Sequence, residues 1–304
     1  MSIFTKQPSF KDNRIENAGR WPVRLTHFHL TDDYSFPATN YPEIFFVQQG
    51  GLLHETKNGK QTIREGFAIL VHPGHQHSIR NPDNVIISRI RYLPEWFTME
   101  YSAVVAMPDV LTLFFDQSWL QYPRDDSLHV FNTRPETHTL IRAELDYLQH
   151  ILKSGQHLEP LSRLSLLKVM AAISQDFQRF WRGAGGPELT PPVQFAFDLI
   201  ERKVFAGDQF RDPALRTGGF DKVEVESEFR SYTGLSPQEY CERRRIFHAA
   251  YYLIATDEDP KNISRITGFP DYTRFNLTFD ETFEIAPEVY REKFRSLVGP
   301  DESV

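Results

Sequence analysis

The chain has 304 residues and a formal net charge of −7, with 40% hydrophobic and 25% charged residues. These values are typical of a soluble globular protein, and the length allows two domains with proper cores. The single cysteine, Cys241, excludes a disulfide framework and a cysteine-based metal cluster, and it fits a reducing cytoplasm. The stretch MSIFTKQPSF has no apolar core of a secretory signal, and no apolar run is long enough to span a bilayer. We therefore predict a cytoplasmic protein that makes no membrane contact.

Residues 20 to 92 carry the signals of β-strands separated by tight turns. Asn58-Gly59 favours a two-residue hairpin turn, and Pro73-Gly74 closes the apolar run FAILV. Short strands at this spacing predict a small antiparallel barrel or sandwich.

From about residue 100 the apolar residues recur with a helical period. One face is formed by Leu140, Ile141, Leu145, Leu148, Ile151 and Leu152, and a second helix or helix pair is indicated by Leu161, Leu164, Leu167, Ile173, Phe177 and Phe180. These helices either supply a dimer contact or pack on the barrel of their own chain. The stretch GAGGPE at 183–188 predicts a flexible link, and the chain beyond it is mostly helical up to Phe294. No repeat at a fixed period is evident.

A second pattern lies within the strand region. Gly66, Pro73-Gly74 and His77 follow the order G-x6-P-G-x-x-H, and Glu43 lies on a preceding strand. This pattern resembles the double-stranded β-barrel of cupin sensor domains. Metal-binding cupins place an H-x-H pair a few residues before the glutamate, where this chain has 36–38, FPA. Two ligands are too few for a catalytic metal, so the resemblance implies a sensor with no metal and no cofactor.

The barrel interior is the candidate ligand site, because barrels of this size hold one small molecule. A mixed aromatic and polar lining suits a sugar or a small organic acid. Glu43 and His77 have simpler interpretations as an edge-strand carboxylate and a turn histidine. The candidate ligand-binding residues are Arg24, His29, Glu43, Phe45, His77 and Arg91, with Arg89 as a further polar contact.

The strongest pattern lies near the C-terminus. An isoleucine is followed by Gly-Phe, then by F-x-x-x-F, then by P-x-x-Y-R, at Ile263, Gly268, Phe269, Phe275, Phe279, Pro287, Tyr290 and Arg291. This pattern resembles the DNA-binding domain of the AraC/XylS family of bacterial transcription regulators, and the resemblance covers about 193–294. It implies two helix-turn-helix units joined by a long helix. A cupin-like sensor followed by helices and this domain is also the order usual in the family.

Local signals support the second helix-turn-helix unit. Asp259-Pro260 and Asp271 are N-cap signals, and Gly268 lies where the chain must turn tightly. Arg and Asn read guanine and adenine edges, and Thr contacts the thymine methyl. The candidate DNA-contacting residues of this helix are Tyr272, Thr273, Arg274, Asn276, Leu277 and Thr278. The same polar residues on an arbitrary helix would be solvated surface. The basic run Arg243–Arg245 is either a phosphate contact, with Arg243 and Arg245 as candidates, or a solvated face.

The stretch KVEVESEFR at 222–230 alternates like a strand, yet the family register makes it the recognition helix of a first unit at about 212–232. Val225 and Phe229 would form its buried face. Lys222 and Ser227 are candidate DNA contacts, whereas the glutamates at 224, 226 and 228 disfavour phosphates. Residues 191–304 hold fifteen Lys and Arg against twenty-one Asp and Glu, a balance of −6.

These signals predict an α+β multidomain chain, with an N-terminal cupin-like β-barrel and flanking helices followed by an all-α domain with two helix-turn-helix units. The boundaries are 1–134 for the sensor, 135–182 for the helical dimerisation region, 183–190 for the linker and 191–304 for the DNA-binding domain. We expect a homodimeric, ligand-responsive transcription activator that reads DNA mainly through its second unit, and no enzyme. A regulator that has become a protein-interaction module and a metal-dependent cupin enzyme are the alternatives.

Overall fold

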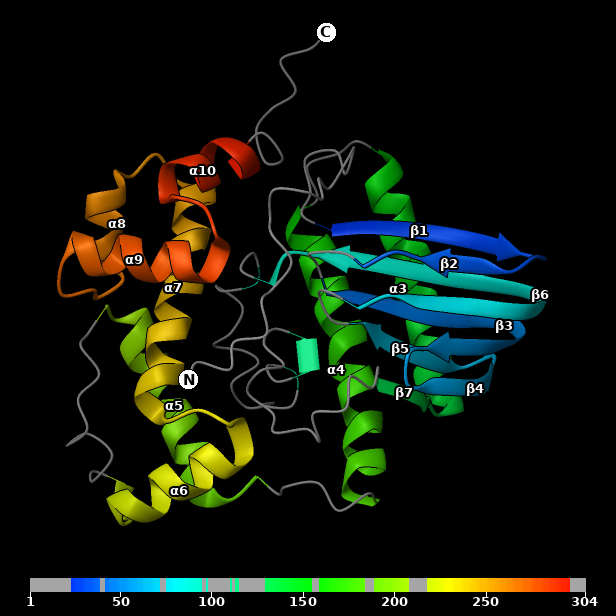
Figure 1. Cartoon of the computed structure of the whole chain (residues 1–304), viewed down its shortest axis with the longest axis horizontal. Coiled ribbons are helices and arrows are strands. Elements are labelled where there is room, and N and C mark those ends of the chain that lie inside the picture. The colour runs from blue at the N-terminus through cyan, green and yellow to red at the C-terminus, as the bar shows by residue number, and fades with distance from the viewer. Residues whose placement is uncertain are drawn as a thin grey trace, which may run out of the picture. The chain divides into compact units, whose positions relative to one another are not determined.

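The computed structural model describes residues 23–38, 42–71, 75–94, 97, 110, 113–114, 129–154, 159–183, 189–207 and 218–295. The chain divides into two compact units. The first contains strands β1 to β7 with helices α3 and α4, and the second contains helices α5 to α10 (Figure 1). None of the described helices is long and apolar enough to cross a membrane.

The first unit is built on one antiparallel sheet, as the turn signals predicted. The strands run in the order β1-β6-β3-β5-β7, with β2 paired to β6 and β4 paired to β3. Their bounds are β1 Val23–Leu30, β2 Tyr34–Phe36, β3 Glu43–Thr56, β4 Gly59–Arg64, β5 Phe67–Val71, β6 His77–Tyr92 and β7 His129–Asn132. Among these described strands β1 and β7 do not pair, so the sheet is open along its path, within the prediction of a small antiparallel barrel or sandwich.

Strand β3 bends within the sheet. A hairpin joins it to β4, but its two turn residues are Lys57 and Asn58, one position before the predicted Asn58-Gly59, and Thr56 lies opposite Gly59. Its pairing with β6 shifts register between Val47 and Leu53. Gly50 lies in this bulge at φ 83°, where a Cβ atom would lie 2.5 Å from the carbonyl oxygen of Asp83. A bulge of this kind changes which alternate residues face inward.

The inner face of the sheet carries an apolar core. Phe45, Val47, Ile69 and Ile87 are fully buried there, in one cluster with seven further buried residues: Leu30, Phe36, Leu52, Ile63, Val71, Ile79 and Val85. The outer face is covered by helix α3, where the Phe46 and His138 rings lie 5.2 Å apart. The inner face of the sheet therefore carries the apolar core, and α3 packs on the outer face at Phe46.

Helices α3, Pro135–Ser154, and α4, Glu159–Gly183, confirm the helical period of this region. Arg134 joins them, because its Nε donates to Asp176 Oδ1 at 2.5 Å. The predicted apolar face is buried at Ile141, Leu145, Leu148 and Ile151. Three leucines of the same pattern are instead exposed, by 38 to 52%, at Leu140, Leu161 and Leu164. The link predicted at 183–190 falls largely outside the described residues.

The second unit is entirely helical in its described part. Its helices are α5 Pro191–Phe205, α6 Lys222–Thr233, α7 Pro237–Ala255, α8 Pro260–Ile266, α9 Tyr272–Phe283 and α10 Pro287–Arg295. Helix α7 packs against each of the other five, as its central position among them in Figure 1 shows. This confirms the long connecting helix that the sequence predicted.

Two aromatic clusters fill the core on either side of α7. Phe197 and Phe229 lie with ring centroids 4.8 Å apart, and Phe279 and Tyr290 lie 5.3 Å apart. Between them Arg244, 0% exposed, donates to both carboxylate oxygens of Glu201 at 2.6 and 2.8 Å. The Tyr240 hydroxyl donates to the same carboxylate at 2.7 Å. A buried charge pair of this geometry fixes α5 on α7.

Candidate nucleic-acid interface and effector site

Helices α6 and α9 begin in the same way. The side chain of Asp221 accepts from the backbone N–H groups of Val223 and Glu224, at 2.8 and 3.3 Å. The side chain of Asp271 accepts from the backbone N–H of Arg274 at 2.7 Å. Each aspartate thus satisfies donors that the first turn of a helix leaves unpaired, and it fixes where the helix starts.

The turn before α9 requires glycine. Gly268 has φ 79°, and a Cβ atom there would lie 2.6 Å from the carbonyl oxygen of Gly207. Gly207 has φ 65°, and its own Cβ would lie 2.2 Å from the carbonyl oxygen of Ile266. The backbones on both sides of this contact approach too closely for any side chain. Helix α8, the Gly268 turn and α9 therefore form the predicted second helix-turn-helix unit.

Helices α6 and α9 also repeat each other residue by residue. The order of exposed, half-buried and buried residues over 221–230 is identical to that over 271–280. Val225 and Phe229 correspond to Phe275 and Phe279, and all four are 0% exposed. Tyr240 corresponds in the same way to Tyr290, fifty positions on. The stretch KVEVESEFR is thus a helix equivalent to α9, and its strand-like alternation misleads. The helix predicted before it lies in 208–217, outside the described residues.

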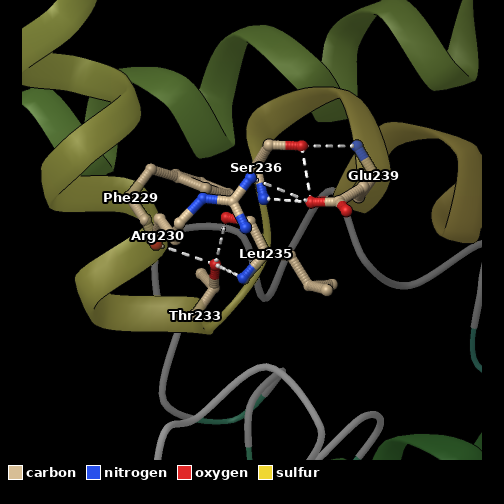
Figure 2. Close-up of polar contacts among 6 residues, drawn as sticks. All are labelled: Phe229, Arg230, Thr233, Leu235, Ser236 and Glu239. Atoms are coloured by element: carbon tan, nitrogen blue, oxygen red, sulfur yellow. Dashed lines mark hydrogen bonds and ion pairs between the residues drawn. The ribbon is translucent and has the colours of Figure 1, made fainter. Parts of the chain in front are cut away.

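A polar network fixes α6 to α7 (Figure 2). The Thr233 hydroxyl donates to the Phe229 carbonyl at 2.7 Å and accepts from the Leu235 N–H at 3.1 Å. Ser236 and Glu239 form a reciprocal cap at the start of α7. Arg230 Nη2 reaches Glu239 at 3.3 Å. The angle at which α6 leaves α7 is therefore set by hydrogen bonds as well as by packing.

The outward face of α9 brings the six predicted contacts together on one helix. Thr273, Arg274 and Leu277 are exposed, while Tyr272, Asn276 and Thr278 are half-buried. Arg274 Nη2 lies 3.2 Å from Glu242 Oε2 on α7, and the Tyr272 hydroxyl donates to Glu288 at 2.6 Å. The buried Phe275 and Phe279 hold the opposite side of the helix in the core.

The outward face of α6 is more acidic. Val223 is 72% exposed, and Glu224 and Ser227 are exposed beside it. Lys222 Nζ lies 3.5 Å from Glu226 Oε1. Glu228 accepts a hydrogen bond from the Thr190 hydroxyl. Two of the three glutamates are therefore already paired within the protein.

The basic run on α7 does not form one surface. Arg244 is buried in its ion pair with Glu201, and Arg245 is 5% exposed. The Arg245 Nε lies beside the Gly268 turn, 3.4 Å from where a Cβ at that glycine would be. The prediction that Arg245 contacts phosphates does not fit this burial, because consecutive residues of a helix point about 100° apart. Arg243 is half-buried and stays a candidate.

In the first unit the sheet brings Glu43, Phe45 and His77 together on its inner face. Arg89 joins them, with its Nε donating to Glu43 Oε1 at 3.0 Å. The Arg89 guanidinium lies 5.5 Å from the Phe45 ring centroid and 5.4 Å from that of Phe36. Glu43 and His77 are each 2% exposed. The Glu43–Arg89 ion pair thus lies against the Phe36 and Phe45 rings on the inner face of the sheet.

His54 completes this group. Its Nε2 lies 3.0 Å from His77 Nδ1, and the His77 ring stacks on Phe36 with centroids 4.9 Å apart. Burial lowers the pKa of His54 to about 4. Burial, with the neighbouring His54 and Arg89 charges, lowers the pKa of His77 to about 3. Both imidazoles are therefore neutral at pH 7, and each has one donor and one acceptor nitrogen.

The other predicted ligand contacts divide between the two faces. Arg91 is the cross-strand partner of Glu43, so these two side chains share the inner face, and Arg24 pairs with Arg91 in the backbone register of β1 and β6. His29 pairs with Ile86 on the opposite face, is exposed, and hydrogen-bonds to Asn84 at 2.6 Å. The prediction that His29 lines the pocket does not fit its position, because alternation turns it outward. No group of three or more His, Cys, Asp or Glu within the described ranges could hold a metal ion.

Known proteins resemble this chain both in its helix-turn-helix region and over most of its length. The family model described as "Helix-turn-helix domain" matches residues 220–293. The "HTH-type transcriptional activator RhaR" of Mannheimia succiniciproducens is 20% identical, over 90% of this chain and 92% of that protein. The "HTH-type transcriptional activator RhaS" of Klebsiella pneumoniae is 23% identical, over 83% and 86%. ToxT from Vibrio cholerae superposes with a TM-score of 0.40 at 14% identity, covering 90% of this chain and 98% of ToxT.

The helix-turn-helix match and these relatives support an AraC/XylS family regulator. The chain is a DNA-binding transcription regulator.

One residue that departs from the AraC/XylS pattern lies at the C-terminal end of α9. The sequence places Glu284 where the family usually has glycine, and Glu284 ends α9 at φ 56°. The corresponding end of α6 is Gly234 at φ 78°. A left-handed residue is favourable for glycine and strained for glutamate. The second unit of this AraC/XylS regulator thus keeps the helix end without the residue that suits it.

Proposed function

We propose that this regulator is a ligand-responsive transcription activator that acts on DNA in the cytoplasm and reads its site mainly through α9. The observation that carries the proposal is the outward face of α9, where Thr273 and Arg274 are exposed on a helix anchored by Phe275 and Phe279. The relatives named above are transcriptional activators, which supports activation as the direction of regulation.

Each residue of this face has a role that its chemistry suits. Arg274 donates two hydrogen bonds to a guanine edge, and Asn276 pairs with an adenine edge. Thr273 and Leu277 offer methyl groups to thymine. Tyr272 and Thr278 contact the sugar-phosphate backbone with their hydroxyls, and Lys222, Ser227 and Arg243 contact phosphates outside this face.

The effector would bind at the inner face of the sheet in the first unit. Arg91 and the Glu43–Arg89 pair offer charged and polar groups on the face that carries Phe45 and His77, and Arg24 is paired with Arg91 on the neighbouring strand. Aromatic faces and paired charges suit the ring and hydroxyls of a sugar, or the carboxylate of a small organic acid. No cofactor is needed for this role.

A homodimer would form through α3 and α4. The two helices meet where Glu144 of α3 accepts hydrogen bonds from Ser165 and Lys168 of α4. Four exposed apolar side chains lie about one helical turn from these residues, namely Leu140 and Tyr147 on α3 and Leu161 and Leu164 on α4. A second copy covering this patch removes apolar surface from water. Sedimentation of the full chain tests it, since Leu164→Asp at a 52% exposed position leaves the fold intact but is expected to yield monomers.

The main test is DNA binding. Fluorescence anisotropy of the full chain with duplexes from its own promoter region, at several salt concentrations, should give an affinity that falls steeply as salt rises. Arg274→Ala should weaken binding to the promoter duplex more than to an unrelated duplex of equal length. Absence of salt-dependent binding at low salt would refute the proposed function.

A further inference from the structure

Helix α6 presents Glu224 from the place at which α9 presents Arg274. Each is the third residue of its helix, and each has its backbone N–H capped by the preceding aspartate. Each is exposed and is followed by a fully buried residue, Val225 or Phe275. The two side chains therefore leave equivalent points of two equivalent helices.

The three glutamates of α6 are not alike. Glu226 lies 3.5 Å from the Lys222 ammonium, and Glu228 accepts from the Thr190 hydroxyl. Within the part of the chain that the structure describes, no hydrogen bond or ion pair engages the Glu224 carboxylate. Glu224 is thus the acidic group of α6 that is available to a ligand on the outward face.

The chemistry of the major groove selects one base for such a group. A carboxylate is an acceptor only. Guanine presents two acceptors and thymine presents one, while adenine presents a donor next to an acceptor that would repel a carboxylate. Cytosine presents the N4 amino donor, and glutamate accepts from it.

We propose that Glu224 reads a cytosine of the DNA site by accepting a hydrogen bond from its N4 amino group. Val223, 72% exposed next to it, lies where Thr273 lies on α9 and contacts the methyl group of a neighbouring thymine. This inference rests on the proposed function and adds to it: α9 supplies most of the affinity, and α6 supplies base discrimination.

The Glu224 carboxylate in the major groove would also change how tightly the protein binds DNA that lacks the matching cytosine. It repels phosphates at every sequence, so it weakens binding in general. The hydrogen bond to cytosine offsets that repulsion at the matching site alone. Glu224 therefore lowers non-specific binding and widens the difference between the matching site and other DNA.

The test is a selection of duplexes with a randomised stretch, bound by the full chain and sequenced. Wild type should enrich a motif with one position specific for cytosine. Glutamine prefers adenine, so Glu224→Gln should move that position from cytosine to adenine and lower its cytosine preference about tenfold. Glu226→Gln is the matched control, because it removes the same charge from the same helix at a residue paired with Lys222. It should leave the motif unchanged.

Two results would overturn the inference. If Glu224→Gln keeps the wild-type motif, whether affinity for all sequences rises or stays constant, Glu224 does not read a base. The proposed function then still stands, because wild type has selected a motif. If wild type enriches no motif, the proposed function fails and this inference fails with it.

Discussion

In the second unit the Arg274 guanidinium lies 3.2 Å from the Glu242 carboxylate, Nη2 to Oε2, and so ties recognition helix α9 to the long helix α7. Glu242 also accepts from Gln238 at 3.2 Å through its other oxygen. The two charged side chains are 51% and 36% exposed, and an exposed pair contributes at most about 1 kcal/mol. Arg274 is therefore held in one orientation by a contact that can be broken at little cost.

The first prediction concerns this pair. Arg274→Ala should weaken binding to the selected DNA site about tenfold or more, since it removes a bidentate base contact. Glu242→Gln should strengthen it about twofold to fivefold, because the competing acceptor loses its charge. Anisotropy titrations measure both. Glu281→Gln, which removes a charge from an exposed position of α9, is the control. An equal gain from Glu281→Gln would mean that net charge alone is responsible.

A second prediction concerns the turn of the second helix-turn-helix unit. Gly268→Ala places a Cβ about 2.6 Å from the Gly207 carbonyl oxygen at a positive φ. The strained backbone alone costs about 1–3 kcal/mol of folding free energy, and the overlap adds to this cost. Gly268→Ala should therefore destabilise the second unit by more than the backbone strain and abolish DNA binding. Gly219→Ala is matched, because Gly219 has φ 78° with no atom within 4 Å of its Cβ position. Thermal unfolding followed by circular dichroism should show a clearly smaller loss for Gly219→Ala, and equal losses would contradict the overlap.

A third prediction separates neighbouring arginines of α7. Arg244→Ala leaves the Glu201 carboxylate buried without its cation, and breaking such a pair costs about 3–5 kcal/mol. Arg243→Ala at a half-buried position should leave the melting temperature nearly unchanged and lower DNA affinity, as a phosphate contact requires. Calorimetry and anisotropy on the same samples test both. A stability loss from Arg243→Ala as large as that from Arg244→Ala would show that the two residues are not divided in this way.

Helix α6 could be predicted only from the alignment of this stretch with the family pattern. The local alternation of valines and glutamates indicates a strand, whereas the alignment makes Val225 and Phe229, four residues apart, one face of a helix. An internal signal for the same helix was present and missed. Four residues recur fifty positions later, namely Asp221 as Asp271, Phe229 as Phe279, Pro237 as Pro287 and Tyr240 as Tyr290, and the apolar Val225 is matched by Phe275. This repeat is hard to detect in the sequence, because only a few positions match at a spacing of fifty and the remaining residues of the two helices differ.

At the proposed effector site, simple alternation along a strand does not predict which side chains face inward. Before the β3 bulge the inward residues are Glu43, Phe45 and Val47, and after it they are Leu52 and His54. The bulge changes odd positions to even ones, so a sequence pattern extended through Gly50 points His54 to the wrong face. His29 was misplaced for a simpler reason. It lies an odd number of positions from Arg24 on the same unbroken strand, so alternation itself puts these two positions on opposite faces.

The last prediction is a pH dependence of the first unit. The pKa values of His54 and His77 are lowered from 6.5 to about 4 and about 3 by burial. The unfolded chain then binds protons that the folded chain does not, so stability is fully present above about pH 6.5 and is lost as the pH falls below it. Each histidine contributes a slope of up to about 1.4 kcal/mol per pH unit.

The slope can be assigned by substitution. His54→Gln with His77→Gln should flatten the loss of stability between pH 6.5 and pH 4 in calorimetric scans of the full chain. His29→Gln, at an exposed histidine on the outer face, should leave it unchanged. A wild-type unit whose stability is constant over this range would contradict the lowered pKa values, because two buried neutral imidazoles cannot become charged without destabilising the fold.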